Sequence, residues 1–161
     1  MQMAGAVKEI MRQHHYPQVT YTALMQCLAA STPLVTRLKL NGVLTLQLEY
    51  CRSINLLVTK CNEKLEVKGW RDEKILLISK KLTVDFYSGR LVVIISLDIS
   101  SSQYQSIVDL NSGSLSKALE DYLLQSEILS TVVTIDMIKH AANASLLQRI
   151  PNADMDNLFW N

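Results

Sequence analysis

Glycine, cysteine and aromatic residues are all scarce in this chain of 161 residues. It contains five glycines, three cysteines and 6% aromatic residues. The glycines are not clustered, and the sequence has no phosphate-binding loop, no G-x-G-x-x-G, no H-E-x-x-H and no nucleophile elbow. The few aromatic residues are not interleaved with basic ones, as a stacking surface for single-stranded nucleic acid would require. These absences argue against an enzyme and against a nucleic-acid-binding module.

The spacing of the candidate metal ligands is also unfavourable. Cys27, Cys51 and Cys61 match neither a disulfide framework nor a four-thiolate zinc site. His14 and His15 are adjacent, and neighbouring residues on a helix point about 100° apart, so the pair is not a natural chelate. We therefore expect buried thiols, no metal and no cofactor.

Neither the net charge nor the hydropathy of the sequence favours binding to a polyanion or insertion into a bilayer. The net charge is +1, which gives no field for nucleic acid or for an acidic membrane surface. The longest uncharged apolar runs, such as Leu91–Leu97, are too short to cross a bilayer. The first 15 residues lack the apolar core of a signal peptide. A cytoplasmic protein that contacts neither nucleic acid nor membrane is expected.

The hydrophobic pattern predicts one α+β domain over residues 1–161. Residues Ala4–His14 have helical spacing, and a second helix begins at Pro17. Pro33 should kink or split this second helix near Thr32, because proline lacks the N–H and its ring clashes with the preceding turn. Two N-terminal helices are therefore expected ahead of the strands.

After residue 42 the period changes to two. Leu44, Leu46 and Leu48 alternate with polar residues, which is typical of a half-buried strand. Similar patterns predict further strands, joined as a mostly antiparallel meander, at Ile54–Lys60, Lys64–Trp70, Ile75–Ser79, Thr83–Tyr87, Leu91–Asp98, Tyr104–Leu110 and Val132–Ile138. Residues Ala141–Ser145 are interpreted as a small-residue connection or one helical turn.

A central amphipathic helix is predicted at Ser114–Gln125. Its apolar stripe has i, i+3, i+4 spacing and consists of Leu115, Ala118, Leu119, Tyr122 and Leu123. Ser114 suits the N-cap position. Glu120 and Asp121 are adjacent and diverge, so we interpret them as a solvated face rather than an acid–base pair. This helix is expected to cover the sheet.

The strand Leu91–Asp98 is apolar on both faces, which is unusual for a sheet with one solvated side. Leu91, Val93 and Ile95 share one face, which should meet the central helix. Val92 and Ile94 point the other way and must meet a partner, a client, or other parts of the monomer or of a homodimer. Val92 and Ile94 are therefore the candidate binding residues.

Five motifs, in order along the chain, resemble one known family. Residues 119–131, LEDYLLQSEILST, resemble the L-E-x-Y-F-x-x-S-E-Q-L-P-T signature of the bacterial thirty-three-kilodalton heat-shock protein, a redox-regulated holdase chaperone. The positions that carry this match include Glu120, Tyr122, Ser126 and Glu127. Tyr104 and Gln105 begin a stretch similar to the family's Y-Q-G-I-V. Three further stretches are similar to motifs of the family. Residues 38–47 are similar to its L-K-F-D-G-x-L-T-L-Q, residues 14–17 to its H-x-Y-P, and residues 146–151 to its L-L-Q-x-L-P.

The resemblance is to the N-terminal, substrate-binding domain of that family. The family's zinc is held by a C-terminal C-x-C and C-x-x-C switch, and Cys27, Cys51 and Cys61 match none of those positions. Its Gly-rich turn before the second strand is also replaced, by residues 49–54, which contain no glycine. The resemblance thus implies the binding domain without its own redox zinc switch.

The resemblance implies an ATP-independent holdase of the stress response. Members of the family bind unfolded or misfolded client proteins through exposed apolar surface, and their active form is a homodimer. The alternative is a degenerate relative, a chaperone-like structural or interaction protein that dimerises or binds one specific partner. An enzyme or metal protein is the third hypothesis, and the missing motifs argue against it.

Overall fold

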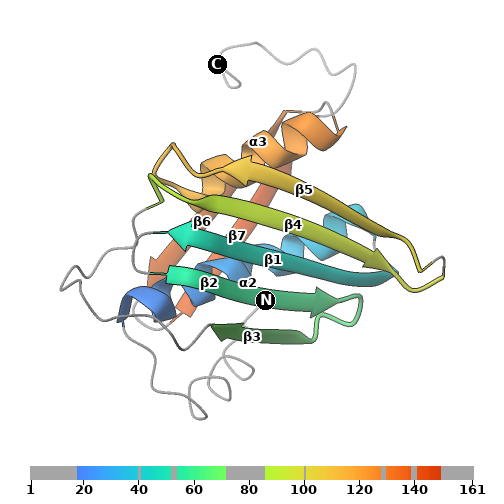
Figure 1. Ribbon diagram of the computed structural model, residues 1–161. Helices are drawn as coiled ribbons and strands as arrows, with labels where there is room; N and C mark the ends of the chain where they lie inside the picture. The colour runs from blue at the N-terminus through green and yellow to red at the C-terminus, as the bar shows by residue number, and fades with distance from the viewer. Residues whose placement is uncertain are drawn as a thin grey trace.

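The fold is α+β, as the sequence predicts. The computed structural model describes residues 18–39, 41–51, 54–71, 86–99, 101–127, 130–138 and 141–149 (Figure 1). Over these ranges it contains two helices, α2 (Gln18–Leu38) and α3 (Leu115–Glu127). The strands are β1 (Gly42–Cys51), β2 (Ile54–Asn62), β3 (Val67–Arg71), β4 (Arg90–Leu97), β5 (Gln103–Asp109), β6 (Thr131–Ile138) and β7 (Ala141–Gln148).

The first five strands form one antiparallel sheet in the order β3-β2-β1-β4-β5. The simple meander predicted from the sequence is wrong after β3, because β4 returns to the far side of β1. The pairing register aligns Leu46 of β1 with Thr59 of β2 and Val93 of β4. Alternation along β1 therefore places its three leucines together on one face, and all three are fully buried.

Helix α2 forms a middle layer of the molecule. It packs against β1, β2 and β3 on one side and against β6 and β7 on the other. Its buried residues therefore lie on several sides of the helix, including Leu24, Leu28 and Leu34. A helix with apolar residues on all sides is typical of such an interior position. The organising helix of the core is α2, and α3 covers the region where β5 and β6 lie.

Of the kink or split that the sequence predicts at Pro33, the structure excludes the split. The helix continues for 21 residues, with Pro33 inside it. The hydroxyl of Ser31 donates to the Cys27 carbonyl at 2.7 Å, and that of Thr36 donates to the Thr32 carbonyl at 3.0 Å. Packing on two sides stabilises the helical conformation where the local preference of proline opposes it.

The prediction of a connection or helical turn at Ala141–Ser145 is wrong. These residues belong to β7, which pairs with β6 from Ile138 opposite Ala141 to Thr131 opposite Gln148. Alanine and asparagine are depleted in strands, so propensity gave no signal for β7. The strand forms because its alternate residues pack against α2.

Several expectations fall outside the described residues. They are the helix Ala4–His14, the strand Ile75–Ser79 and most of Thr83–Tyr87. Phe86 is described, and it makes an isolated β-bridge with Gly113. Among the helices of the described ranges, none is long and apolar enough to cross a membrane.

Candidate functional site on the outer face of the sheet

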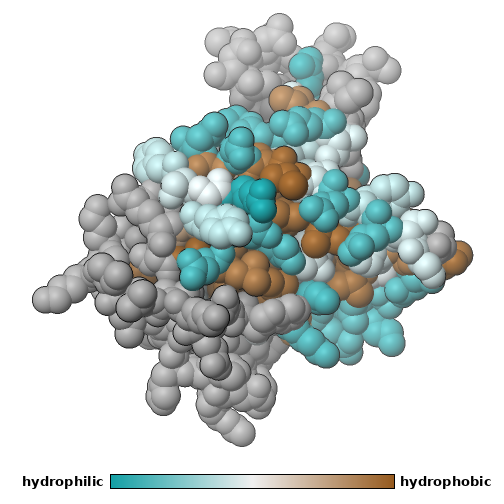
Figure 2. All heavy atoms as spheres, viewed as in Figure 1, coloured by the Kyte–Doolittle hydropathy of each residue, from teal (hydrophilic) through white to brown (hydrophobic). Residues whose placement is uncertain are grey.

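The five-stranded sheet has one covered face and one outer face. Helix α2 lies behind the sheet in Figure 1, so the viewer looks onto the outer face. Alternation along β1 and β4 places Gln47, Val92 and Ile94 on this side. In Figure 2, which has the same viewpoint, hydrophobic and hydrophilic residues are interspersed over the sheet. The outer face is therefore a mixed surface rather than a continuous apolar patch.

One row of cross-strand neighbours, called here the apolar row because all its members but Gln47 are apolar, crosses the outer face. Val58, Gln47, Val92 and Ile107 are cross-strand neighbours on β2, β1, β4 and β5. Val92 is 2% exposed and Val58 is 3% exposed, whereas Ile107 on the edge strand is 49% exposed. Of the alternatives that the sequence left open for Val92, the structure shows burial within the monomer.

Ile94 and the edge strand provide the more accessible part of this face. Ile94 is half-buried, and its cross-strand neighbour Gln105 on β5 is exposed. Tyr104 points to the opposite face from Gln105 but is also exposed, because β5 is the outermost strand of this sheet. The structure thus places the signature residue Gln105 beside the candidate residue Ile94, whereas Tyr104 lies opposite Ile95 on the other face of the sheet. Contact of Val92 and Ile94 with a client stays a prediction.

A polar cluster closes one end of the outer face. The guanidinium Nε of Arg90 lies 2.6 Å from a Glu49 carboxylate oxygen, and Gln47 donates to the other oxygen at 3.2 Å. The Arg90 guanidinium also lies over the Tyr50 ring, 5.7 Å from its centroid. The hydrogen bond and charge of Glu49 raise the pKa of Arg90 above its ordinary value. Arg90 is therefore charged and makes this end of the outer face polar. Contacts with apolar groups are limited to the rest of the outer face.

The signature helix α3 has a structural function that the sequence did not predict. One carboxylate oxygen of Glu120 accepts a hydrogen bond from the backbone N–H of Val133 at 2.9 Å. The interpretation of Glu120 as a solvated residue is therefore wrong, since it connects α3 to β6 across 13 positions of sequence. Its place in the signature was the only sequence signal for this role.

The predicted apolar stripe and N-cap of α3 are confirmed, whereas its main packing is against β6 and β5 and not over β4 as expected. The five residues of the apolar stripe are buried, with Tyr122 only 5% exposed. The Lys117 backbone N–H donates to the Ser114 hydroxyl at 3.1 Å, as an N-cap requires. Ser126 is exposed in the last turn, and Glu127 is the last residue of the helix. These contacts assign α3 an architectural role.

Replacement of Glu120 by alanine should destabilise the fold. The Val133 N–H would lose its acceptor in a partly buried position, so we expect the free energy of unfolding to fall by about 1–3 kcal/mol. Asp121→Ala is the matched control, because Asp121 makes only a half-exposed ion pair with Lys117 at 3.3 Å, worth at most about 0.5 kcal/mol. Urea unfolding measures both values. Equal losses in the two variants would contradict the proposed role of Glu120.

The cysteines do not fit a zinc site. Cys27, Cys51 and Cys61 are free and buried. Burial raises the pKa of Cys61 to about 11, and burial and then the nearby charge of Cys51 raise the pKa of Cys27. Zinc binds thiolates, which these environments disfavour. In the part of the chain that the structure describes, no three His, Cys, Asp or Glu residues gather as a metal site would need.

Comparisons with known proteins agree with this architecture. The family model described as "Hsp33 protein" matches residues 1–159. A "33 kDa chaperonin" from Chromobacterium violaceum is 29% identical over 163 residues, which cover 100% of this chain and 55% of the relative. A "33 kDa chaperonin" from Pseudomonas syringae pv. syringae is 31% identical over 149 residues, which cover 91% and 49%. The chain thus spans about half the length of these curated relatives.

A solved structure shares the fold. The crystal structure of a 33 kDa chaperonin from Thermotoga maritima superposes with a TM-score of 0.64 at 22% identity. The match covers 87% of this chain and 51% of that one. It supports the arrangement of helices and antiparallel strands described above.

Proposed function

The chain belongs to the Hsp33 protein family, and on this basis we propose that it acts as an ATP-independent, holdase-type chaperone domain. It binds unfolding proteins through the accessible apolar part of the outer face, from Ile94 on β4 to Ile107 on β5. The relatives that it resembles are named chaperonins rather than enzymes, which supports a binding function. The proposed clients are unfolded or misfolded proteins of the bacterial cytoplasm.

The observation that carries this proposal is the exposure of Ile107 on an edge strand. Ile107 is 49% exposed, and its strand β5 has β4 on one side and no strand on the other within the five-stranded sheet. An unfolding client presents aliphatic side chains and an extended backbone with free hydrogen-bonding groups. A strand edge that carries an exposed isoleucine can contact both, as in strand addition. The same edge supports association of the chain as a homodimer.

The activity proposed for these 161 residues requires neither bound zinc nor an oxidant. The raised pKa values of Cys27 and Cys61 disfavour the thiolates that both metal binding and oxidation need. The outer face also needs no conformational switch to present Ile107, which is already exposed. Binding of clients is therefore proposed to be constitutive in this chain.

The burial of Val92 favours a second candidate function. Most of the apolar row is buried, and the Glu49–Arg90 pair makes one end of the face polar. A smaller accessible apolar area suits one specific partner, or dimerisation, better than general capture of unfolded chains. The alternative is therefore a degenerate, chaperone-like interaction or structural protein.

An aggregation assay tests the proposed holdase activity. We expect the chain, in several-fold molar excess, to suppress light scattering by a thermally unfolding test protein without ATP, zinc or oxidant. A chelator should leave this suppression unchanged, because no step of the proposal involves a metal. An absence of suppression at that excess would rule out the holdase. A stoichiometric complex with one captured protein, without suppression, would support the alternative.

A further inference from the structure

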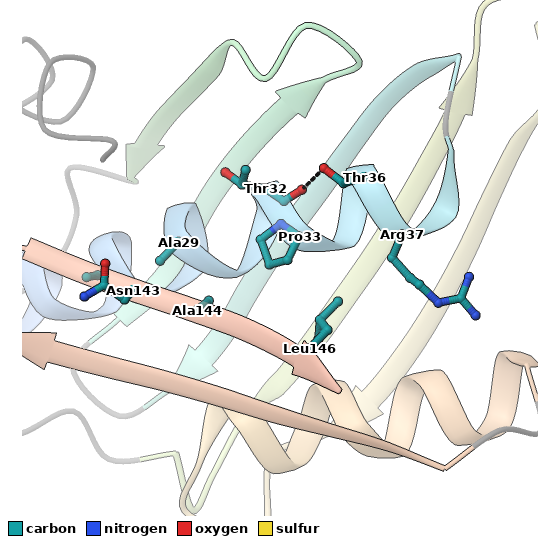
Figure 3. Close-up of a pocket in the computed structure, with 9 residues that line it drawn as sticks. Ala29, Thr32, Pro33, Thr36, Arg37, Asn143, Ala144 and Leu146 are labelled. Atoms are coloured by element: carbon teal, nitrogen blue, oxygen red, sulfur yellow. Dashed lines mark hydrogen bonds between the residues drawn. The ribbon is translucent and has the colours of Figure 1, made fainter. Parts of the chain in front are cut away.

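The connection between α2 and β1 ends in the dipeptide Asn41-Gly42. Arg37 marks the last turn of α2 in Figure 3, and the chain passes from this end of the helix into β1. Asn41 is exposed and immediately precedes Gly42, the first residue of the strand. Among the described residues, none forms a hydrogen bond with the Asn41 side chain. The carboxamide of Asn41 is therefore accessible to water and to its own backbone.

The backbone N–H of Gly42 is not held by either neighbouring strand. The Asp98 N–H donates to the Asn41 carbonyl at 3.1 Å, so Asn41 and every second residue after it bond to β4. The Gly42 N–H points instead toward β2, whose pairing with β1 begins only at Val43 opposite Asn62. Within the described ranges this N–H donates no hydrogen bond. The Gly42 nitrogen is thus available to the adjacent side chain.

The packing of β4 against β1 requires glycine at position 42. An added Cβ would collide with the Ser96 carbonyl oxygen and would lie 3.0 Å from the Leu97 Cα atom. The absence of a Cβ also means that no side chain hinders the Gly42 nitrogen as it approaches the Asn41 carboxamide. The fold therefore places next to Asn41 the residue that least obstructs ring closure.

We propose that Asn41 is a site of spontaneous covalent modification, namely deamidation through a cyclic succinimide. The Gly42 nitrogen loses its proton to solvent base and bonds to Cγ of Asn41, while the bond from Cγ to the side-chain nitrogen breaks and releases ammonia. Water then opens the ring. Hydrolysis of the new N–Cγ bond gives aspartate, and hydrolysis of the original backbone N–C bond gives isoaspartate. This chemistry needs only water and does not depend on the proposed chaperone function.

The two products should differ in their effect on the end of the sheet. Both place a carboxylate directly opposite Asp98, and like charges opposite each other on neighbouring strands are destabilising. Isoaspartate also adds a carbon to the backbone before Gly42, so the pairing with Asp98 no longer continues the register set by Gly42 opposite Leu97. Aspartate leaves the backbone unchanged, and it is the residue at this place in the similar family motif L-K-F-D-G. We expect the isoaspartate product to lose the first pairing of β1 with β4.

Mass spectrometry of the 161-residue chain, incubated at mildly alkaline pH and digested at intervals, tests the proposal. Conversion of Asn41 to the acid should be less than about tenfold slower in the folded chain than in guanidinium chloride, because the fold leaves this site open. Asn62 is the control for protection by folding. Its amide oxygen accepts from the Lys64 and Glu66 N–H groups, and its NH₂ group donates to the Glu66 carboxylate at 2.7 Å. If folding slows Asn41 as much as Asn62, or by more than tenfold, the proposal is overturned.

Two variants locate the modification and its effect. Asn41→Gln would have to close a larger ring, so an isoaspartate-specific methyltransferase should label the aged parent chain and lose most of that label in the aged variant. Equal labelling of the two chains would refute the site. Asn41→Asp carries the same charge as isoaspartate without the additional backbone carbon. The isoaspartate form, separated from the aged chain, should unfold at a lower urea concentration than Asn41→Asp, and coincident unfolding curves would refute the effect on β1–β4 pairing.

Discussion

Replacement of Ile107 by glutamate should raise the concentration of chain needed to suppress half of a client's aggregation by about tenfold. Ile107 is 49% exposed on the edge strand β5, so the monomer tolerates a charge there. In the complex with a client, the same carboxylate would be desolvated against aliphatic side chains without a partner, which is strongly unfavourable. Light scattering of a thermally unfolding test protein, over a series of chain concentrations, gives the value.

Ile99→Glu is the matched control for Ile107→Glu. Ile99 is 87% exposed in the connection between β4 and β5, away from the apolar row. The same substitution there should leave the suppression curve unchanged, and both variants should unfold within about 0.5 kcal/mol of the parent chain. Full activity of Ile107→Glu would remove the outer face from the mechanism. An equal loss in both variants would indicate a general effect of charge.

Replacement of Gly89 by alanine should be the most destabilising of these single substitutions. Gly89 has φ +91°, a conformation that residues with a Cβ rarely adopt. An added Cβ would also lie 2.4 Å from the Glu49 carbonyl oxygen and 2.8 Å from the Tyr50 carbonyl carbon. Strain and overpacking against the β1 backbone together should lower the free energy of unfolding by about 2–5 kcal/mol. Urea unfolding followed by circular dichroism measures this loss.

Gly69→Ala provides the comparison for Gly89→Ala. A Cβ at Gly69 would lie 2.5 Å from the Leu24 Cδ1 atom, at the end of a side chain that can rotate. Gly69 does not have a left-handed backbone, so conformational strain does not add to the contact. We expect a loss of about 1 kcal/mol. If Gly69→Ala were the more destabilising variant, rigid contact with the β1 backbone would not be the dominant factor at Gly89.

Local patterns predicted those parts of the fold in which one face of an element is buried. Alternating leucines gave β1, and the structure buries Leu44, Leu46 and Leu48 completely. The i, i+3, i+4 stripe and Ser114 gave α3 with its N-cap. In both elements the period of the apolar residues equals the period of the backbone, so neighbouring positions carry enough information.

The candidate site was only partly predictable, because the exposure of its residues depends on which strands lie beside them and not on local periodicity. The sequence identified β4 as apolar on both faces, but the exposure of its outer residues depends on β1 and β5. Val92 is buried next to Gln47 and Ile107, whereas Ile94 is half-buried beside the exposed Gln105. Ile107, the most exposed of the apolar residues in the row with Val58 and Val92, was not singled out, because an edge position is defined by strand order.

The sequence by itself determined the α+β class, the family, the strand β1 and the amphipathic helix α3. Only the tertiary structure decided that α2 continues through Pro33, that the alanine-rich β7 is a strand, and that Glu120 holds β6. Each of these three features depends on contacts between segments far apart in the chain, such as α2 with β7. Such contacts add a few kcal/mol and override local preferences that amount to about 1–3 kcal/mol.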